Sequence, residues 1–523
     1  MTDETKKTNN GEEKGEKEQP KDLIVESKHS IVINGQTLNY TVTCGTMVLK
    51  EETQKKGEKE GEAEGEKPKA TIFFTAYTVD EDGGTQPPSG SPLKGGREAE
   101  VGRMPSAPTS RPLTFSFNGG PGSSSVWLHL GLLGPRRVQM DEIGNPLPPP
   151  GGLVDNEFSL LDQTDLVFID PVSTGYSRAV PGEKPRQFHG FSKDIASVGD
   201  FIRLYTSRYQ RWDSPKFLIG ESYGTTRAAG LSGYLQERHG MYLNGIMLIS
   251  AILNFQTARF GPGNDLPHIL FLPTYTATAW YHQRLAPELQ ANLQAALRQV
   301  EAFARGEYTL ALMQGAALPA EERTAIIRKL AYFTGLSEDY IDRTDLRIEI
   351  FRFTKELLRH ERRTVGRLDS RFKGIDRDSA GERYEFDPSY ANIQGVYTAA
   401  FNAYVRGELN FESDLPYEIL TNRVWPWSYA EFENSYLNVA ETLRQAMCTN
   451  PYLKVYVANG YFDFATPYFA TEYTFNHLGL DESLRGNLRM GYFEAGHMMY
   501  IHLPSLAKLR EALENFISEA MRV

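Results

Sequence analysis

Cysteine is scarce in this sequence of 523 residues, which contains only Cys44 and Cys448. Two cysteines cannot form the disulfide framework that stabilises many secreted proteins. Residues 1–22, MTDETKKTNNGEEKGEKEQPKD, also lack the basic start and apolar run of a secretory signal peptide. We therefore expect a protein of a reducing compartment, the cytoplasm.

Long apolar runs and an excess of basic residues are missing as well. No apolar stretch is long enough to cross a bilayer, so we expect no contact with a membrane. The chain carries 56 Lys and Arg against 67 Asp and Glu, a formal net charge of -11. Its basic residues form neither a stripe nor a basic helix, which argues against a nucleic acid partner.

What the sequence does contain is enough apolar material for a large core, since 40% of its residues are hydrophobic. The polar stretch 1–28 predicts a disordered tail. Alternating and β-branched residues in HSIVINGQTLNYTVTCGTMVL (29–49) and ATIFFTAYTV (70–79) predict strands. Between them the densely charged stretch 51–68 indicates a solvated loop, with a partner-binding segment as the less favoured alternative. The Pro-, Gly- and Ser-rich stretch 81–111 indicates a second surface loop.

Short apolar runs recur in the rest of the chain and are typical of strands buried on both faces. Helical patterns at 192–208 and 225–238 separate the early runs, so we expect an α/β protein with a mostly parallel central sheet flanked by helices. The runs are LTFSF (113–117), DLVFID (165–170), KFLIG (216–220), GIMLIS (245–250), LKVYVANG (453–460) and LRMGYF (488–493).

The alternation of strands and helices stops after residue 255. Stretches such as PELQANLQAALRQVEAFARG (287–306) and AEERTAIIRKLAYFTG (320–335) have the pattern of amphipathic helices. We therefore expect a core formed by residues 29–255 and 431–523. A largely helical insertion, 256–430, separates these two parts and caps the sheet.

A serine between two glycines follows one of the apolar runs. KFLIGESYGTTRAAG (216–230) has the pattern of a strand, a turn and a helix, with Gly220-Glu221-Ser222-Tyr223-Gly224 at the turn. A serine hydroxyl becomes a useful nucleophile only beside a base, and a sharp strand-to-helix turn with small flanking residues exposes it. We predict that Ser222 is a catalytic nucleophile. An idle serine in a glycine-rich turn is the alternative.

Candidates for an acid and a base follow two later strands. In three-layer hydrolases the order along the chain is Ser, then Asp or Glu, then His. Asp463 comes directly after LKVYVANG, and His497 comes directly after LRMGYF. The other nine histidines lack this setting. We predict that Asp463 orients His497 and that His497 is the base for Ser222.

A glycine-rich loop, FSFNGGPGSSS (115–125), follows the first apolar run of the predicted sheet. Its glycines allow the backbone to approach a substrate closely, and an oxyanion hole needs one donor from such a loop. The second donor is expected to be the N–H of Tyr223, the residue after the nucleophile. No Gly-Lys-Ser or Gly-Lys-Thr follows the loop and no zinc-ligand spacing is present, so we expect neither a metal nor a cofactor.

Five segments together resemble the motifs of the serine carboxypeptidases, peptidase family S10, which have the α/β-hydrolase fold. They are FNGGPGSSS, LVFIDPVSTGYS, IGESYG, NGYFDFATP and EAGHMMY. The resemblance covers about 110–260 and 450–510, and the insertion only by position. It implies a hydrolase that acts on peptides and removes C-terminal residues through an acyl-enzyme. It also implies a monomer or a homodimer.

The resemblance assigns roles to individual residues of this sequence. It implies a triad, two backbone donors of the oxyanion hole, and a set of residues that recognise the substrate carboxylate. In that order they are Ser222, Asp463 and His497; Gly120 and Tyr223; and Asn118, Gly119 and Glu221.

Three positions depart from the family pattern. Ser116 stands where Trp is frequent, Leu132 stands where a second Glu is frequent, and Ser123 replaces a common Cys. The first two bear on exopeptidase specificity, because the second Glu would share carboxylate recognition and Glu221 is then expected to act without it. An esterase or acyltransferase with the same triad therefore remains an alternative. A binding protein on an inactive hydrolase scaffold is a third reading, which the complete triad opposes.

Overall fold

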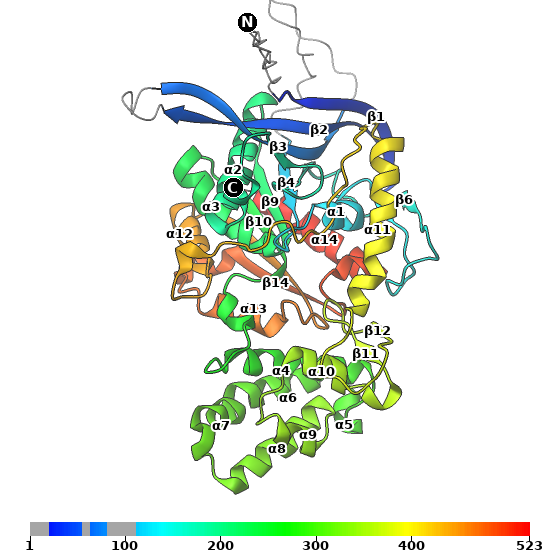
Figure 1. Cartoon of the computed structure of the whole chain (residues 1–523), viewed down its shortest axis with the longest axis vertical. Helices are drawn as coiled ribbons and strands as arrows, with labels where there is room; N and C mark the ends of the chain where they lie inside the picture. The colour runs from blue at the N-terminus through cyan, green and yellow to red at the C-terminus, as the bar shows by residue number, and fades with distance from the viewer. Residues whose placement is uncertain (1–19, 55–62, 81–110, 523) are drawn as a thin grey trace, which may run out of the picture.

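A single large sheet organises the protein. The computed structural model describes residues 20–54, 63–80 and 111–522, and among these ten strands form one sheet in the order β1-β2-β3-β7-β4-β9-β10-β13-β14, with β8 beside β3 (Figure 1). The strands are β1 (Leu23–Ile33), β2 (Gln36–Gln54), β3 (Ala63–Val79), β4 (Leu113–Phe117), β7 (Asp165–Ile169), β8 (Arg178–Ala179), β9 (Lys216–Ser222), β10 (Gly245–Ala251), β13 (Lys454–Gly460) and β14 (Leu488–Phe493).

The six apolar runs are the six parallel strands of this sheet. β7, β4, β9, β10, β13 and β14 pair with their neighbours in parallel, whereas β1, β2, β3 and β7 are joined by antiparallel ladders. The prediction of a mostly parallel central sheet is confirmed. Because the carboxyl ends of parallel strands meet at one edge, the loops after β4, β9, β13 and β14 come together there.

Apolar side chains on both faces hold the sheet between helices. Along β9, Phe217 and Ile219 belong to one apolar cluster and Leu218 to the other, as expected for a strand whose successive side chains point to opposite faces. The first cluster includes residues of α11 (Pro388–Gly407) and α14 (Leu503–Ala520). The second includes residues of α2 (Phe191–Arg208), α3 (Tyr223–His239) and α12 (Ala440–Thr449).

The helices between β10 and α11 form a lobe beneath the sheet in Figure 1, with an apolar cluster of their own. They are α4 (Leu266–Tyr281), α5 (Pro287–Gln290), α6 (Leu293–Phe303), α7 (Thr309–Gln314), α8 (Ala320–Thr334), α9 (Glu338–Arg343) and α10 (Ile350–Glu356). A hairpin of β11 (Thr364–Val365) and β12 (Lys373–Gly374) follows. Residues 408–439 contain no α-helix, and bridges join Glu418 and Leu420 to the core.

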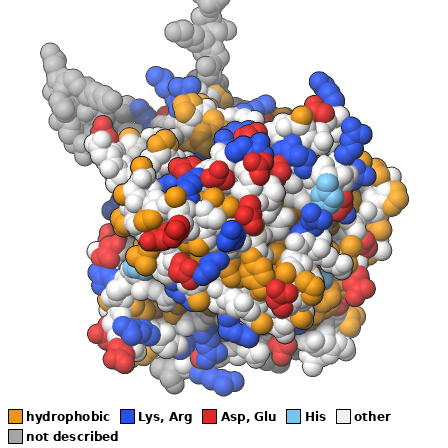
Figure 2. Space-filling model, turned by 90° about the horizontal axis from the view of Figure 1, so that it is seen from below, with side chains coloured by type: hydrophobic (Ala, Val, Ile, Leu, Met, Phe, Trp, Pro, Cys, Tyr) orange, Lys and Arg blue, Asp and Glu red, His pale blue; other side chains and the backbone are white. Residues whose placement is uncertain are grey.

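Three smaller elements lie near the edge where the loops meet. They are α1 (Val126–Leu128), the pair β5 (Arg136–Val138) and β6 (Leu153–Asp155), and α13 (Tyr468–Asn476). The view from below in Figure 2 shows basic and acidic side chains intermingled over the lobe, with hydrophobic groups between them. In the described ranges no helix has both the length and the apolar character needed to cross a membrane.

Two predicted boundaries differ from the structure. β1 begins at Leu23, inside the expected tail 1–28, because residues 23–28 pair with residues 41–46 of β2. β2 and β3 also continue into the charged stretch 51–68, where Lys50 and Glu66 lie 3.6 Å apart across the ladder. Residues 1–19, 55–62 and 81–110 lie outside the described part of the chain.

Candidate active site

Ser222 sits at a sharp turn between β9 and α3. Its backbone has φ 60° and ψ −129°, a conformation that non-glycine residues rarely adopt. The turn is so tight that a Cβ on Gly220 would lie 2.2 Å from the carbonyl oxygen of Gly224. The two flanking glycines are therefore required for close packing, and the strand, turn and helix expected around Ser222 are all present.

His497 and Asp463 form a buried pair in the loops after β14 and β13. The Nδ1 atom of His497 lies 2.7 Å from Oδ2 of Asp463. The same oxygen accepts a hydrogen bond from the hydroxyl of Thr466 at 2.6 Å, and Oδ1 accepts from the N–H of Ala465 and of Thr466. Asp463 is fully buried, so these bonds fix both the carboxylate and the imidazole that it holds.

Asp463 and His497 stabilise each other's charged forms. Burial alone would raise the pKa of Asp463, but the charge and hydrogen bond of His497 and the bonds from Thr466 lower it below its ordinary value. Burial likewise opposes the charged form of His497, but Asp463 and, to a smaller extent, Glu221 raise the pKa of the imidazole above its ordinary value. The pair therefore favours a positively charged His497, the form that accepting a proton would create.

Strand pairing brings Ser222 and His497 to the same place. Ser222 is the register partner of Ala251 in β10, and the neighbouring Ser250 donates a hydrogen bond to the carbonyl oxygen of His497 at 2.7 Å. Within the described part of the chain no hydrogen bond joins the Ser222 hydroxyl to His497. Such bonds often tighten only when substrate binds.

The glycine-rich loop after β4 lies against the start of α3. A Cβ on Gly119 would come within 2.4 Å of the backbone nitrogen of Tyr223, so the loop and this N–H are in direct contact. Tyr223 is the first residue of α3, where backbone N–H groups have no acceptor within the helix and the helix dipole is positive. Gly120 has φ +105°, a backbone conformation suited to glycine. The two backbone segments expected to form the oxyanion hole are thus adjacent to Ser222.

Glu221 and Asn118 are buried near Ser222. Burial raises the pKa of Glu221 to about 7, against the opposing effects of His497 and of a hydrogen bond from Tyr500. The hydroxyl of Tyr500 donates this bond to Oε2 of Glu221. Asn118 accepts the N–H of Leu128 through Oδ1, and its Nδ2 has no hydrogen-bond partner among the described residues. A buried amide without an acceptor is a donor available to a ligand.

Leu132 supplies no second acid beside Glu221, but Tyr500 supplies a polar partner there. Gly131 makes room for it: a Cβ there would lie 2.4 Å from the Tyr500 ring and 2.7 Å from the hydroxyl of Tyr397. Leu132 is fully buried in the apolar cluster that also contains both tyrosines. A tyrosine three residues after His497 thus stands beside Glu221, and no rule of spacing identified it in advance.

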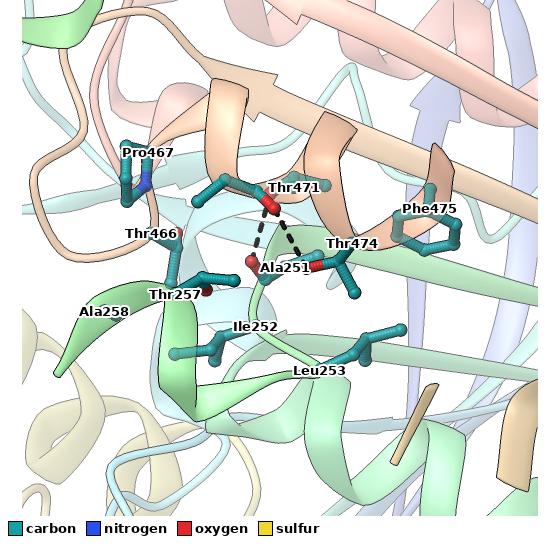
Figure 3. A pocket seen from close by; sticks show the side chains of 11 residues that line it. Ala251, Ile252, Leu253, Thr257, Ala258, Thr466, Pro467, Thr471, Thr474 and Phe475 are labelled. Carbon is teal, nitrogen blue, oxygen red and sulfur yellow. Dashed lines mark hydrogen bonds between the residues drawn. The ribbon is translucent and has the colours of Figure 1, made fainter. Parts of the chain in front are cut away.

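A small pocket opens beside the strand ends that carry the site (Figure 3). It lies between the end of β10 and α13, where Thr471 donates a hydrogen bond to the carbonyl oxygen of Ala251 at 3.2 Å. Its walls are mostly aliphatic, with Phe475 at one end, and Thr466 joins it to Asp463. The described residues contain no group of three or more His, Cys, Asp and Glu that could hold a metal ion.

Comparison with known proteins identifies the family and the fold. The sequence profile of the serine carboxypeptidase family, Peptidase_S10, matches residues 103–492. The prohormone-processing carboxypeptidase Kex1 of Saccharomyces cerevisiae has a TM-score of 0.52 at 15% identity, over 91% of each chain. A proline iminopeptidase of Mycobacterium smegmatis has a TM-score of 0.32 at 12% identity, over 94% of this chain and 98% of its own. No curated protein matches the sequence significantly. The likeness to Kex1 is one of fold, the α/β-hydrolase fold.

Proposed function

Because the chain belongs to the serine carboxypeptidase family, we propose that Ser222, Asp463 and His497 form its catalytic triad. The protein is a serine-type carboxypeptidase, a hydrolase whose substrates are peptides. The observation that carries the assignment is the convergence of a strained Ser222 turn with the buried His497–Asp463 pair at the carboxyl edge of one sheet.

Acylation begins with the hydroxyl of Ser222. Its oxygen attacks the carbonyl carbon of the last peptide bond, and its proton passes to Nε2 of His497. Asp463 holds Nδ1 of the imidazole and stabilises the positive charge that forms. His497 then gives the proton to the leaving nitrogen, the C–N bond breaks, and the C-terminal amino acid departs from the acyl-enzyme.

Deacylation repeats these steps with water. A water molecule loses a proton to Nε2 of His497 and attacks the ester carbonyl. The ester bond to Ser222 breaks, and the proton returns to its oxygen. In both steps the N–H groups of Gly120 and Tyr223 bind the negative oxygen of the tetrahedral intermediate. The contact of the glycine loop with the start of α3 supports this assignment.

The free carboxylate of the substrate binds to Asn118, Gly119 and Glu221. Asn118 Nδ2 is buried without an acceptor, and the pKa of Glu221 is raised by burial to about 7, so that below neutral pH Glu221 is a neutral hydrogen-bond donor. Two neutral donors recognise an anion without the repulsion that an ionised Glu221 would exert. This requirement for a free carboxylate separates a carboxypeptidase from the alternative, an esterase or acyltransferase with the same triad.

A defined peptide library tests the function directly. The purified enzyme is incubated with peptides and with the same peptides amidated at the C-terminus, and products are followed by mass spectrometry. Stepwise loss of single C-terminal residues from the free acids alone supports a carboxypeptidase. Turnover of simple esters with both peptide sets untouched would instead favour the esterase or acyltransferase.

The cellular setting is part of the same proposal. We place the enzyme in the cytoplasm, as a monomer or homodimer without a nucleic acid partner. Both cysteines are free thiols, Cys44 buried and Cys448 exposed, which is compatible with a reducing compartment. Cell fractionation tests the location, and light scattering on the purified protein tests the oligomeric state.

A further inference from the structure

The helical insertion contacts the candidate acid and base directly through one short segment. Residues Arg367–Ser370, here called the strap, lie between β11 and β12. The N–H of His497 donates to the carbonyl oxygen of Leu368 at 2.7 Å, and the N–H of Phe464 donates to that of Arg367 at 3.0 Å. The strap therefore binds the loop after β13, which carries Asp463, and the loop after β14, which carries His497. These two are here called the catalytic loops.

The next two strap residues repeat this pattern. The N–H of Gly496 donates to Oδ2 of Asp369 at 3.0 Å, and the N–H of Ser370 donates to the carbonyl oxygen of Phe462 at 2.9 Å. Four consecutive residues of the insertion thus bind both loops. Two of them bind the residues on either side of Asp463, and two bind Gly496 and His497. Because a peptide unit is rigid, fixing these backbone groups also fixes the positions from which the side chains of Asp463 and His497 extend.

Asp369 is the centre of this arrangement. It is 2% exposed, and its carboxylate is held by Arg371, with Nη2 of Arg371 2.6 Å from Oδ2. A Cβ on Gly496 would lie 2.4 Å from the Cβ of Asp369, so glycine before His497 is required for this contact. A buried ion pair of this kind is costly to form. This cost suggests a role beyond holding together a loop that is already well packed.

The strap is itself anchored in the insertion. The carbonyl oxygen of Ser370 lies 2.7 Å from Nε2 of His282, the residue after α4, and its hydroxyl lies 2.6 Å from that of Thr278 on α4. From the other side, the hydroxyl of Ser389 on α11 accepts the N–H of Leu368 at 2.9 Å. These contacts tie the strap to α4 on one side and to α11 on the other.

Aromatic rings extend the connection around Asp463. The ring of Phe462 lies 5.3 Å from that of Tyr281, and the ring of Phe464 lies 5.4 Å from that of Tyr275. Both tyrosines belong to α4, and both phenylalanines belong to the apolar cluster of the helical lobe. The residues that flank Asp463 are thus packed into the insertion rather than into the sheet.

We propose that Asp369, held by Arg371, is a positioning residue for His497 and that the insertion sets the geometry of the acid–base pair through the strap. This inference rests on the proposed role of His497. Asp369 does not touch substrate. It acts through the Gly496 N–H, and loss of that bond lets the His497 loop shift. A displacement of about 1 Å in a catalytic group costs on the order of 100-fold in rate.

The test compares Asp369→Ala with a matched variant in the same insertion. Lys355 and Asp376 form another buried ion pair, each side chain 4% exposed, and Asp376 makes no hydrogen bond to either catalytic loop. Asp376→Ala is therefore the control for loss of a buried carboxylate. Active sites are titrated with a fluorophosphonate, so that kcat refers to folded, reactive enzyme.

We expect Asp369→Ala to lower kcat per titrated site by about 10- to 100-fold with KM close to the wild-type value. Asp369→Asn, which keeps a side-chain oxygen for the Gly496 N–H, should recover part of the loss. Asp376→Ala should lower the melting temperature with kcat unchanged. The double variant Asp369→Ala/Arg371→Met also removes the arginine charge that Asp369→Ala leaves unpaired. It replaces the single variant if the single variant does not fold.

Two outcomes would overturn the inference, and a third would overturn its premise. Equal kcat per titrated site in Asp369→Ala and Asp376→Ala would make Asp369 merely structural, as would a loss confined to KM. His497→Ala separates the premise from the inference. If His497→Ala is inactive while the Asp369 variants are fully active, only the positioning role fails. If His497→Ala keeps its activity, the proposed triad itself is wrong.

Discussion

The hydroxyl of Tyr500 donates a hydrogen bond to Oε2 of Glu221, the residue that precedes Ser222. When Glu221 is neutral, this bond leaves its proton on the other oxygen, Oε1. The proton is then available to a substrate carboxylate. Tyr500 thus orients a carboxyl group whose pKa burial raises to about 7, and two measurements follow from this arrangement.

Changing Glu221 to Gln should remove one limb of the pH profile. Glu221 is neutral below its pKa of about 7 and negative above it, so kcat/KM for a blocked dipeptide should fall as the pH rises through 7. The amide of the same dipeptide has no carboxylate to repel and should not share this fall. Gln cannot ionise, so Glu221→Gln should hold its efficiency on the free acid into alkaline pH. Identical wild-type and mutant profiles on the free acid would contradict the assigned role.

Changing Tyr500 to Phe should shift that limb without removing it. The hydrogen bond from Tyr500 lowers the pKa of Glu221, because it stabilises the ionised carboxylate. Without the bond the pKa rises, and the fall in kcat/KM on the free acid should move to higher pH. The measurement is the midpoint of this limb in both proteins, with the amide substrate as control. A shift to lower pH would show that Tyr500 stabilises the neutral form instead.

Replacing Ser222 by Ala should abolish turnover while the fold persists. Losses of several orders of magnitude in kcat are usual for such a nucleophile, on the order of 10⁶-fold in a comparable triad. Fluorophosphonate labelling should disappear with the activity, and circular dichroism should be unchanged. Ser192→Ala, at an exposed position on α2, is the matched control. A Ser222→Ala protein with most of the wild-type rate would mean that another residue is the nucleophile.

A methyl group at Gly220 should disrupt the turn that holds Ser222. The new Cβ would lie 2.2 Å from the backbone oxygen of Gly224, an atom that cannot move without moving α3. Overpacking of this kind costs about 1–3 kcal/mol of unfolding free energy, and it displaces the nucleophile as well. Gly261→Ala is the control, since a Cβ there would meet nothing within 4 Å. Denaturant unfolding and kcat should both change in Gly220→Ala, and neither should change in Gly261→Ala.

Deleting residues 1–28 should lower the melting temperature by several degrees. The deletion removes six residues of β1, whose backbone pairs with residues 41–46 of β2, and it removes the ion pair between Asp22 and Arg208. Deleting residues 1–19 leaves these interactions in place and is the control. Equal melting temperatures for both truncated proteins and the full chain would show that the start of β1 contributes nothing to stability.

Local patterns in the sequence were sufficient to predict the parallel half of the sheet and the sharp turn at Ser222. Runs such as Phe217–Ile219 are apolar at consecutive positions because both faces of the strand are buried, and this needs no knowledge of the fold. Ser222 was identified because its glycines reflect a steric demand, which the distance from Gly220 to Gly224 now explains.

Contacts between segments distant in sequence could not be predicted in the same way. Tyr500 is one of 27 tyrosines, and only the path of the chain after His497 brings its hydroxyl to Glu221. Asp369 lies 127 positions before Gly496, in a stretch with no periodic pattern. The start of β1 was missed for a different reason: its residues 23–28 mix apolar and charged side chains, as an edge strand with one exposed face does.

The order of the strands has a consequence for the newly made chain. Ser222 lies between β9 and α3, but Asp463 and His497 follow only with β13 and β14, which come later in the chain. Synthesis proceeds from the N-terminus, and a domain generally folds as a unit. A ribosome-bound chain that ends before β13 therefore carries Ser222 without Asp463 and His497. The proposed triad is therefore complete only after β14 and the loop that carries His497 have been synthesised.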